Sequence, residues 1–342
     1  MFFRYNPFQL QVLPPLPAGA VYIDDVYIVP IADNFFDGFE SGDFSALDWT
    51  VAGEQGWVVD GTDPYEGLYS AHVRTEDLSG TQAESSLDLS VELADSGFIQ
   101  FYFLAPVQMP FESFNLWVDG QFLTPLTTEG GGWTEGGALL GAGSHDISWK
   151  YARNPGGAPE DMFPPAAVWR AGEAWLDNVE LLPATPSFLE IWLTGDFTAN
   201  PWVLGGEGRW TITDQRYFQD LEPYSATARS QDITRTSTGR SLLSIDIITE
   251  RGGLLQFSML ASVGAPFDIA NVLLDDNAVL TYSEVEQDWV QSQVNIQPGK
   301  RRVTFELIKN PGDIDSAVLE TIPPPPGWQG QIWLDNIIFT TN

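Results

Sequence analysis

Aspartates inside similar apolar segments are the residues of this sequence most able to bind a cation. Asp177 and Asp335 each follow a Trp-Leu pair and precede an Asn, and Asp24 occupies the matching place near the N-terminus. A carboxylate buried in an apolar strand needs a counter-charge or hydrogen-bond donors. Ca²⁺ is one such partner, because it prefers several oxygen ligands. Alternatively, each Asp accepts backbone N–H bonds at a strand end, which would also keep it ionised.

A Ca²⁺ site would need further carboxylates from the opening strand and the first loops of the same unit. The candidate metal ligands are the acids of the first unit and the two strand aspartates: Asp37, Glu40, Asp60, Asp63, Asp177 and Asp335. The corresponding acids of the second unit are Glu190, Asp214 and Asp220. The sequence contains no EF-hand loop pattern, so the prediction is a structural Ca²⁺ held by residues distant in sequence.

Glycoside hydrolysis uses two carboxylates at a set separation, and the acids of the middle strand are the candidates for such a pair. On a regular strand Glu173 and Asp177 share a face, whereas Glu180 points the other way. The second unit has Gln331 and Ile338 in place of the two glutamates. The chain has no Cys and only two His, far apart in sequence, so Cys catalysis is excluded and His-based sites have little support. We expect no enzymatic activity.

Tryptophans are the other residues with binding chemistry, and the chain has 13 of them. Eight form four pairs at matching places in the two halves, and we interpret these as core residues of a shared fold. Trp169 and Trp328 have no such match and lie in Pro-rich loops before the last strands. Exposed indoles could stack on sugar rings. The alternative is that each indole fills the gap beneath its own loop.

The elements that position these residues are strands. The Asp-containing segment occurs at residues 21–28, 174–181 and 332–339, with aromatic, aliphatic and β-branched residues around the Asp. That composition is typical of β-strands. The Gly-Asp-Phe motifs at 42–44 and 195–197 follow their strand aspartates at the same spacing, so the N-terminal copy is in register with the others.

The whole chain reads as many short strands separated by turn residues, without sustained helical periodicity, which favours β-sandwiches. Residues 31–185 and 186–342 repeat the same order of motifs, and each length suits one domain. Residues 1–30 match only the last hairpin of a unit. We therefore predict an all-β chain of two tandem sandwiches preceded by an extra β-hairpin.

The N-terminal hairpin has three possible explanations. The sequence could be a piece of a longer array, the hairpin could be donated to a neighbouring subunit, or it could cap the sheet edge of the first unit. If it is donated, the residues expected to mediate assembly are Tyr22, Ile23, Asp24, Val26 and Ile28.

The formal charge of −32 excludes several partners. Such a chain repels nucleic acid and anionic membranes, and it suits extracellular or salty water. The sequence has no apolar run of about 18 residues, so we expect no membrane insertion. The opening Met1-Phe2-Phe3-Arg4 is not typical of a signal peptide, so a secreted protein would have lost its leader or the sequence would be part of a longer chain.

Several motifs resemble the MAM-like jelly-roll modules of bacterial surface proteins and adhesins. They are Gly-Phe-Glu-Ser-Gly-Asp-Phe at 38–44, Tyr-Glu-Gly-Leu-Tyr-Ser-Ala at 65–71, the segment 143–150 and the closing Trp-Leu-Asp-Asn. The resemblance implies a jelly-roll or concanavalin-like sandwich in an extracellular setting, with a structural Ca²⁺ in some relatives. The chain departs from animal MAM domains in having no Cys, and Leu193 stands where the first unit has Glu40.

These observations predict a non-enzymatic structural or adhesion protein, extracellular or on the cell surface. Its tandem jelly-roll units would assemble with copies of themselves, through strand exchange, into a filament, sheath or surface array. The alternative is a pair of carbohydrate-binding modules that grips polysaccharide through unpaired aromatics and Ca²⁺-bound loops. We expect neither nucleic acid nor membrane insertion in either case.

Overall fold

The structure is a computed structural model, and it describes residues 34–54, 56–74, 83–107, 111–128, 131–153, 172–218, 223–233 and 238–342. The predicted N-terminal hairpin at 1–30, with its expected assembly residues, lies outside the described residues. So does Trp169. Strand exchange therefore stays a prediction.

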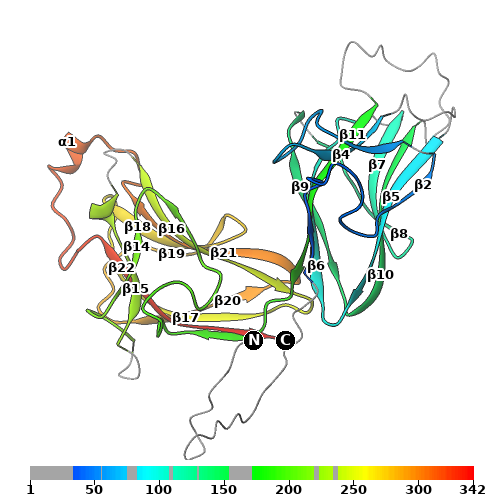
Figure 1. The fold of residues 1–342 in the computed structure, drawn as a ribbon. Coiled ribbons are helices and arrows are strands. Elements are labelled where there is room, and N and C mark those ends of the chain that lie inside the picture. The colour runs from blue at the N-terminus through cyan, green and yellow to red at the C-terminus, as the bar shows by residue number, and fades with distance from the viewer. Residues whose placement is uncertain are drawn as a thin grey trace, which may run out of the picture.

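Four antiparallel sheets form two β-sandwiches in tandem, which confirms the predicted all-β fold (Figure 1). In unit one, sheet 1a has the order β3 (Trp57–Asp60), β4 (Ser70–Arg74), β11 (Glu173–Pro183), β6 (Gly97–Leu104) and β9 (Thr134–Leu140), with β1 (Phe36–Asp37) also paired to β11. Sheet 1b has the order β2 (Thr50–Gly53), β5 (Ala83–Leu93), β10 (Gly143–Arg153), β7 (Glu112–Val118) and β8 (Gln121–Pro125).

Unit two repeats this topology strand for strand. Sheet 2a has the order β14 (Trp210–Thr213), β15 (Ser225–Arg229), β22 (Gln331–Thr341), β17 (Gly253–Ser262) and β20 (Val290–Ile296), with β12 (Phe188–Glu190) also on β22. Sheet 2b has the order β13 (Val203–Gly206), β16 (Gly239–Thr249), β21 (Gly299–Lys309), β18 (Asp268–Leu274) and β19 (Asn277–Tyr282). Among the described residues, the short helices are η4 (Ser230–Asp232) and α1 (Ser316–Leu319).

Each core lies between the two sheets of a unit and is built by alternation along the strands. On β10, Ile147, Trp149 and Tyr151 are fully buried and face the core of unit one, while the residues between them face outward. On β21 the matching inward residues are Val303 and Phe305, followed by Leu307. Because the same positions are apolar in both units, one sandwich geometry serves both.

The repeated strands that carry Asp177 and Asp335 are β11 and β22, and each lies in the middle of its sheet. The last strand of unit one ends at Pro183 and the first of unit two begins at Phe188. The predicted boundary between 185 and 186 falls in this short connection. None of the helices among the described residues has the length and apolarity to span a bilayer.

The interpretation of all eight repeated tryptophans as core residues is wrong for some of them. Trp57 and Trp210 do pack in the cores, but Trp175 and Trp333 lie on the outer faces of sheets 1a and 2a. Their strand neighbours on either side face inward, so the indoles must face outward. Trp175 is nonetheless buried, and the ring of His72, which is also buried, stacks on it with centroids 4.5 Å apart.

Candidate functional site

The strand aspartates hold loops against the outer faces of sheets 1a and 2a. Asp177 accepts N–H bonds from Asn178 at 2.7 Å, Tyr65 at 2.9 Å and Glu66 at 3.4 Å. Asp335 accepts N–H bonds from Asn336 at 2.7 Å and Phe218 at 2.8 Å. These contacts match the alternative to a Ca²⁺ site, in which each strand aspartate accepts backbone N–H bonds.

Burial has a clear electrostatic effect at Asp177. Its side chain is fully buried, and this desolvation raises its pKa to about 6 although three backbone N–H groups act in the opposite direction. The nearby charge of Glu40 raises the pKa further. The expectation that hydrogen bonds keep this carboxylate firmly ionised is therefore too simple, because desolvation is the larger effect.

The other candidate metal ligands also accept hydrogen bonds from protein groups. Asp37 accepts from the backbone of Phe39 and the indole of Trp49, both at 2.7 Å. Glu40 accepts from the backbone of Leu68 at 2.9 Å and Tyr69 at 3.1 Å. The two bonds to Glu40 fix the 65–69 loop to the opening segment of unit one.

Asp60 has a different set of partners, His72 and Arg74. Asp60, at the end of β3, lies 3.0 Å from Nδ1 of His72 and 3.5 Å from Arg74, and Asp63 is in the loop that follows. Within the described residues, no three Asp, Glu or His side chains come together in a group that could hold a metal. The Ca²⁺ site stays a prediction, which a Ca²⁺ titration against an EDTA-treated control would test.

Trp328 is held inside its own loop. Its indole Nε1 donates to Asp268 at 2.9 Å, and its ring lies 5.2 Å from that of Phe267. Asp268 is completely buried. The indole thus fills the space beneath the loop, as in the alternative interpretation, and its role in ligand binding stays a prediction.

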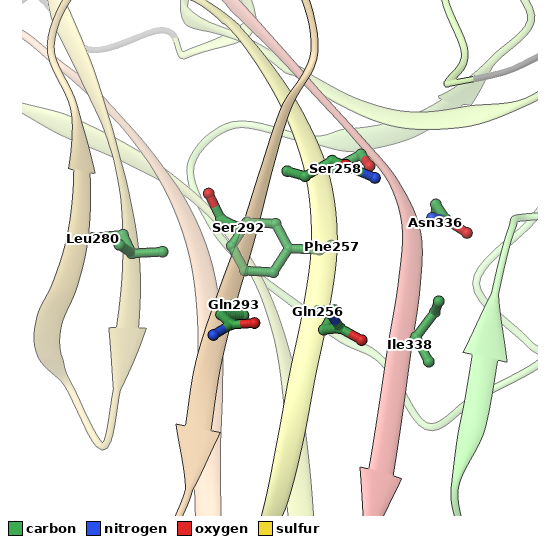
Figure 2. Close-up of a pocket in the computed structure, with 9 residues that line it drawn as sticks. Gln256, Phe257, Ser258, Leu280, Ser292, Gln293, Asn336 and Ile338 are labelled. Carbon is green, nitrogen blue, oxygen red and sulfur yellow. The ribbon is translucent and has the colours of Figure 1, made fainter.

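An open trough of about 410 Å³ lies on sheet 2a, at its β20 edge (Figure 2). Its lining comes mainly from β17, β20 and β22, and consists of Gln256, Phe257, Ser258, Leu280, Gln291, Ser292, Gln293, Asn336 and Ile338. Every polar group in this lining is an amide or a hydroxyl. Among the residues that the structure describes, no ionisable side chain lines the trough, although the chain carries 47 acids and 15 bases.

Strand register brings these side chains together. Gln256 on β17 lies between Ile338 on β22 and Gln293 on β20. Two residues on, Ser258 lies between Asp335 and Gln291. Alternation sends these side chains to the same face. A register shift between β17 and β22 lies beside Asn336, whose φ of 50° is in the left-handed region that Asn tolerates.

An aromatic pair borders the Ser258 end of the trough. Phe218 is held over the sheet by its N–H bond to Asp335, the residue paired with Ser258. Its ring meets that of Trp289 edge-on, with centroids 5.9 Å apart, and Trp289 directly precedes β20. Both side chains are partly exposed. The strand aspartate therefore positions one ring of an aromatic pair that lies next to the trough lining.

The matching face of unit one is filled. Tyr102 stands where Ser258 stands, between Asp177 and Glu135, and Tyr65 stacks on it with centroids 3.8 Å apart. Burial is the main reason that the pKa of Tyr102 rises to about 12. Gly137 replaces Gln293, and a Cβ there would lie 2.4 Å from the ring of Phe98.

The trough was missed at the level of sequence. A usable signal was present in β20, where Gln291, Gln293 and Asn295 alternate with inward-facing residues. Such alternation places three amides on one exposed face. The alternation in β20 does not show that the small residue Ser258 lies opposite these amides on the neighbouring strand. The trough is lined by both strands.

No protein-family model matches the chain. No curated protein matches it either. The predicted MAM-like resemblance therefore stays a prediction.

Solved structures with a similar arrangement of sheets exist. The tandem CBM22-1–CBM22-2 domain of Paenibacillus barcinonensis Xyn10C is 14% identical, with 91% of this chain and 98% of that chain covered and a TM-score of 0.32. The tandem CBM51 modules of a Streptococcus pneumoniae family 98 glycoside hydrolase are 9% identical, with coverages of 90% and 100% and a TM-score of 0.28.

A third similar structure corresponds to a single unit. The K1 cleaved adhesin domain of Porphyromonas gingivalis Lys-gingipain is 14% identical, covering 46% of this chain and 99% of that domain, with a TM-score of 0.35. Similarities this low carry no argument about function, which must rest on the site itself.

Proposed function

We propose that this chain is a non-catalytic extracellular carbohydrate-binding protein, and that the trough on sheet 2a holds a neutral polysaccharide. The observation that carries this proposal is that the described residues of the lining are uncharged, with amides on β17 and β20 and with an aromatic pair beyond one end of the trough. Amide side chains both donate and accept hydrogen bonds, as sugar hydroxyls do. Aromatic rings contact the apolar faces of sugars.

Charge supports a neutral ligand. An anionic glycan would be repelled by a chain of net charge −32, and the described residues of the lining offer it no Lys or Arg to pair with. A cationic ligand would find no carboxylate among the described residues of the lining. These residues also lack the two carboxylates that glycoside hydrolysis uses, which supports binding rather than cleavage.

The proposal is tested by native gel electrophoresis in gels containing neutral polysaccharides, each compared with an acidic one. Retardation by at least one neutral polymer, and by no acidic polymer, is expected. Replacing both Gln291 and Gln293 by Ala should weaken retention about tenfold or more, since each lost hydrogen bond contributes about 1 kcal/mol. Gln121→Ala, an exposed amide of unit one, is the matched control and should bind normally.

Assembly through strand exchange remains the other candidate from the sequence, but it depends on residues 1–30, outside the described part of the chain. Light scattering of the chain with and without these residues tests it independently. Regular polymers that disappear on truncation would favour assembly. Absence of glycan retention in the gel experiment would contradict the binding proposal.

A further inference from the structure

The unit-one face that corresponds to the trough contacts unit two. Lys300, at the start of β21 in unit two, donates to Gln100 and, at 2.9 Å, to Glu135. Both acceptors belong to unit one, on β6 and β9. In Figure 1 the tip of β21 accordingly lies close to β6.

Strand register shows which positions Lys300 covers. Gln100 pairs with Gly137, as Gln256 pairs with Gln293. Glu135 pairs with Tyr102, as Gln291 pairs with Ser258. The ammonium group thus binds the unit-one counterparts of Gln256 and Gln291, two amides of the trough.

Charge on both sides suits this contact. Lys300 is one of only three lysines in the chain, and its side chain is 15% exposed. Asp246 lies 3.8 Å from its ammonium group, and binds Arg302 through both carboxylate oxygens at 2.7 and 2.8 Å. Asp246 therefore holds the two cations side by side at the end of unit two that meets Glu135.

The connection between the units is also bonded to both of them. Ala184 donates its N–H to Ser96 of unit one at 3.1 Å, and Thr185 donates to Ile248 of unit two at 2.7 Å. Ile248 donates in return to the Thr185 hydroxyl at 2.9 Å. A short connection bonded in this way leaves the units few relative orientations once a second contact forms.

We propose that Lys300 docks unit two onto the unit-one counterpart of the trough, which fixes the angle between the units and leaves one carbohydrate site per chain. The number of sites rests on the proposed function, whereas the docking does not. One face of the repeated fold thus has two uses: an open trough in unit two and a docking surface in unit one. Glu135 is partly exposed, so the docking should weaken as salt increases.

Small-angle X-ray scattering of the full chain without ligand tests the docking. Lys300→Glu and Glu135→Lys should each enlarge the radius of gyration and broaden the distance distribution, and the double charge exchange should restore both. Lys150→Glu is the control, since its ion pair with Glu84 at 3.7 Å lies within unit one, and it should leave the scattering unchanged. Identical scattering from all variants would overturn the docking.

Calorimetric titration of the wild type with an oligosaccharide of the retained polymer tests the number of sites. A stoichiometry of one per chain is expected, and two equal sites would overturn that part of the inference. Failure to bind any neutral polymer would remove the proposed function, and with it the single-site claim, while the scattering result would still decide the docking.

Discussion

Tyr102 and Ser258 occupy the same register position, each opposite the buried aspartate of its central strand, and only the serine leaves the sheet face open. In unit one the space above this position is taken by the ring of Tyr65 stacked on Tyr102. In unit two the corresponding space belongs to the trough. The exchange of Tyr102 for Ser258 is therefore one of the differences between the filled face and the face with the trough.

Ser258→Tyr should close the trough. The phenol would project from β17 into the volume lined by Gln256 and Gln291, as Tyr102 does on the matching face. We expect retention on neutral polysaccharide to fall at least tenfold. Because Ser258 is completely buried, the larger side chain should also lower the thermal unfolding midpoint. Thr281→Tyr, on the outer face of sheet 2b, controls for an added ring. Unchanged retention by Ser258→Tyr would place binding elsewhere.

Asp177 should make the stability of unit one depend on pH. Its pKa of about 6 in the folded protein exceeds the ordinary value of 3.8, so folding favours its protonated form. Stability should therefore rise as pH falls through about 6, and the gain should be complete below about 4, with a ceiling of about 3 kcal/mol. Calorimetric unfolding at pH 7.5 and 5 measures this.

The Asp177→Asn variant isolates the effect. An amide cannot titrate, so the difference in unfolding free energy between wild type and variant should change with pH in the direction just given. Asp60 and Asp119 have lowered pKa values, and their contributions to stability are lost only as pH falls below their ordinary range. A difference that is constant between pH 7.5 and 5 would contradict a raised pKa at Asp177.

Gly206 should not tolerate a side chain, whereas the adjacent Gly205 should. Gly206 has a φ of 81°, and a Cβ there would lie 2.3 Å from the carbonyl oxygen of Arg240. Gly206→Ala should cost about 1–3 kcal/mol of unfolding free energy. At Gly205 the nearest atom would be 3.6 Å away, so Gly205→Ala should change stability by about 0.5 kcal/mol or less. Urea unfolding compares them, and equal losses would contradict the explanation.

Trp328→Ala should reduce stability rather than binding. The change removes the indole that donates to Asp268, and a buried carboxylate that loses a donor costs about 1–3 kcal/mol. Urea unfolding and polysaccharide retention, measured on the same preparation, separate the two roles. Lost retention with unchanged stability would instead support the sugar-stacking role expected from the sequence.

Sequence alone predicted the repeated strands and the tandem sandwiches, because motif spacing and alternation carry that information. The role of Asp177 and Asp335 as Ca²⁺ ligands stays a prediction. Sequence alone did not predict that Trp175 lies outside the core. β11 is apolar on both faces around that position, so alternation cannot show which face is inward. The indole is covered by His72, which lies far away in sequence.

The trough could not be predicted for a different reason. The trough is a volume lined by residues of three strands. It depends on the small side chain of Ser258 and on the strand register that places Gln291 opposite Ser258 and Gln256 two residues away. Cross-strand register is set by the assembled sheet and cannot be read from one strand. The sequence similarity between the two units suggested that their sheet faces would be alike, and it did not reveal the effect of having Ser258 where unit one has Tyr102.

The uncharged trough lies within a chain whose net charge is −32. In a hydrated gel that mixes acidic and neutral polymers, the acidic strands would exclude this protein by a Donnan effect at low ionic strength, while the neutral strands would retain it. The chain would therefore concentrate in the neutral regions of such a matrix and would spread more evenly as salt is added. Its distribution would then report the local composition of the gel.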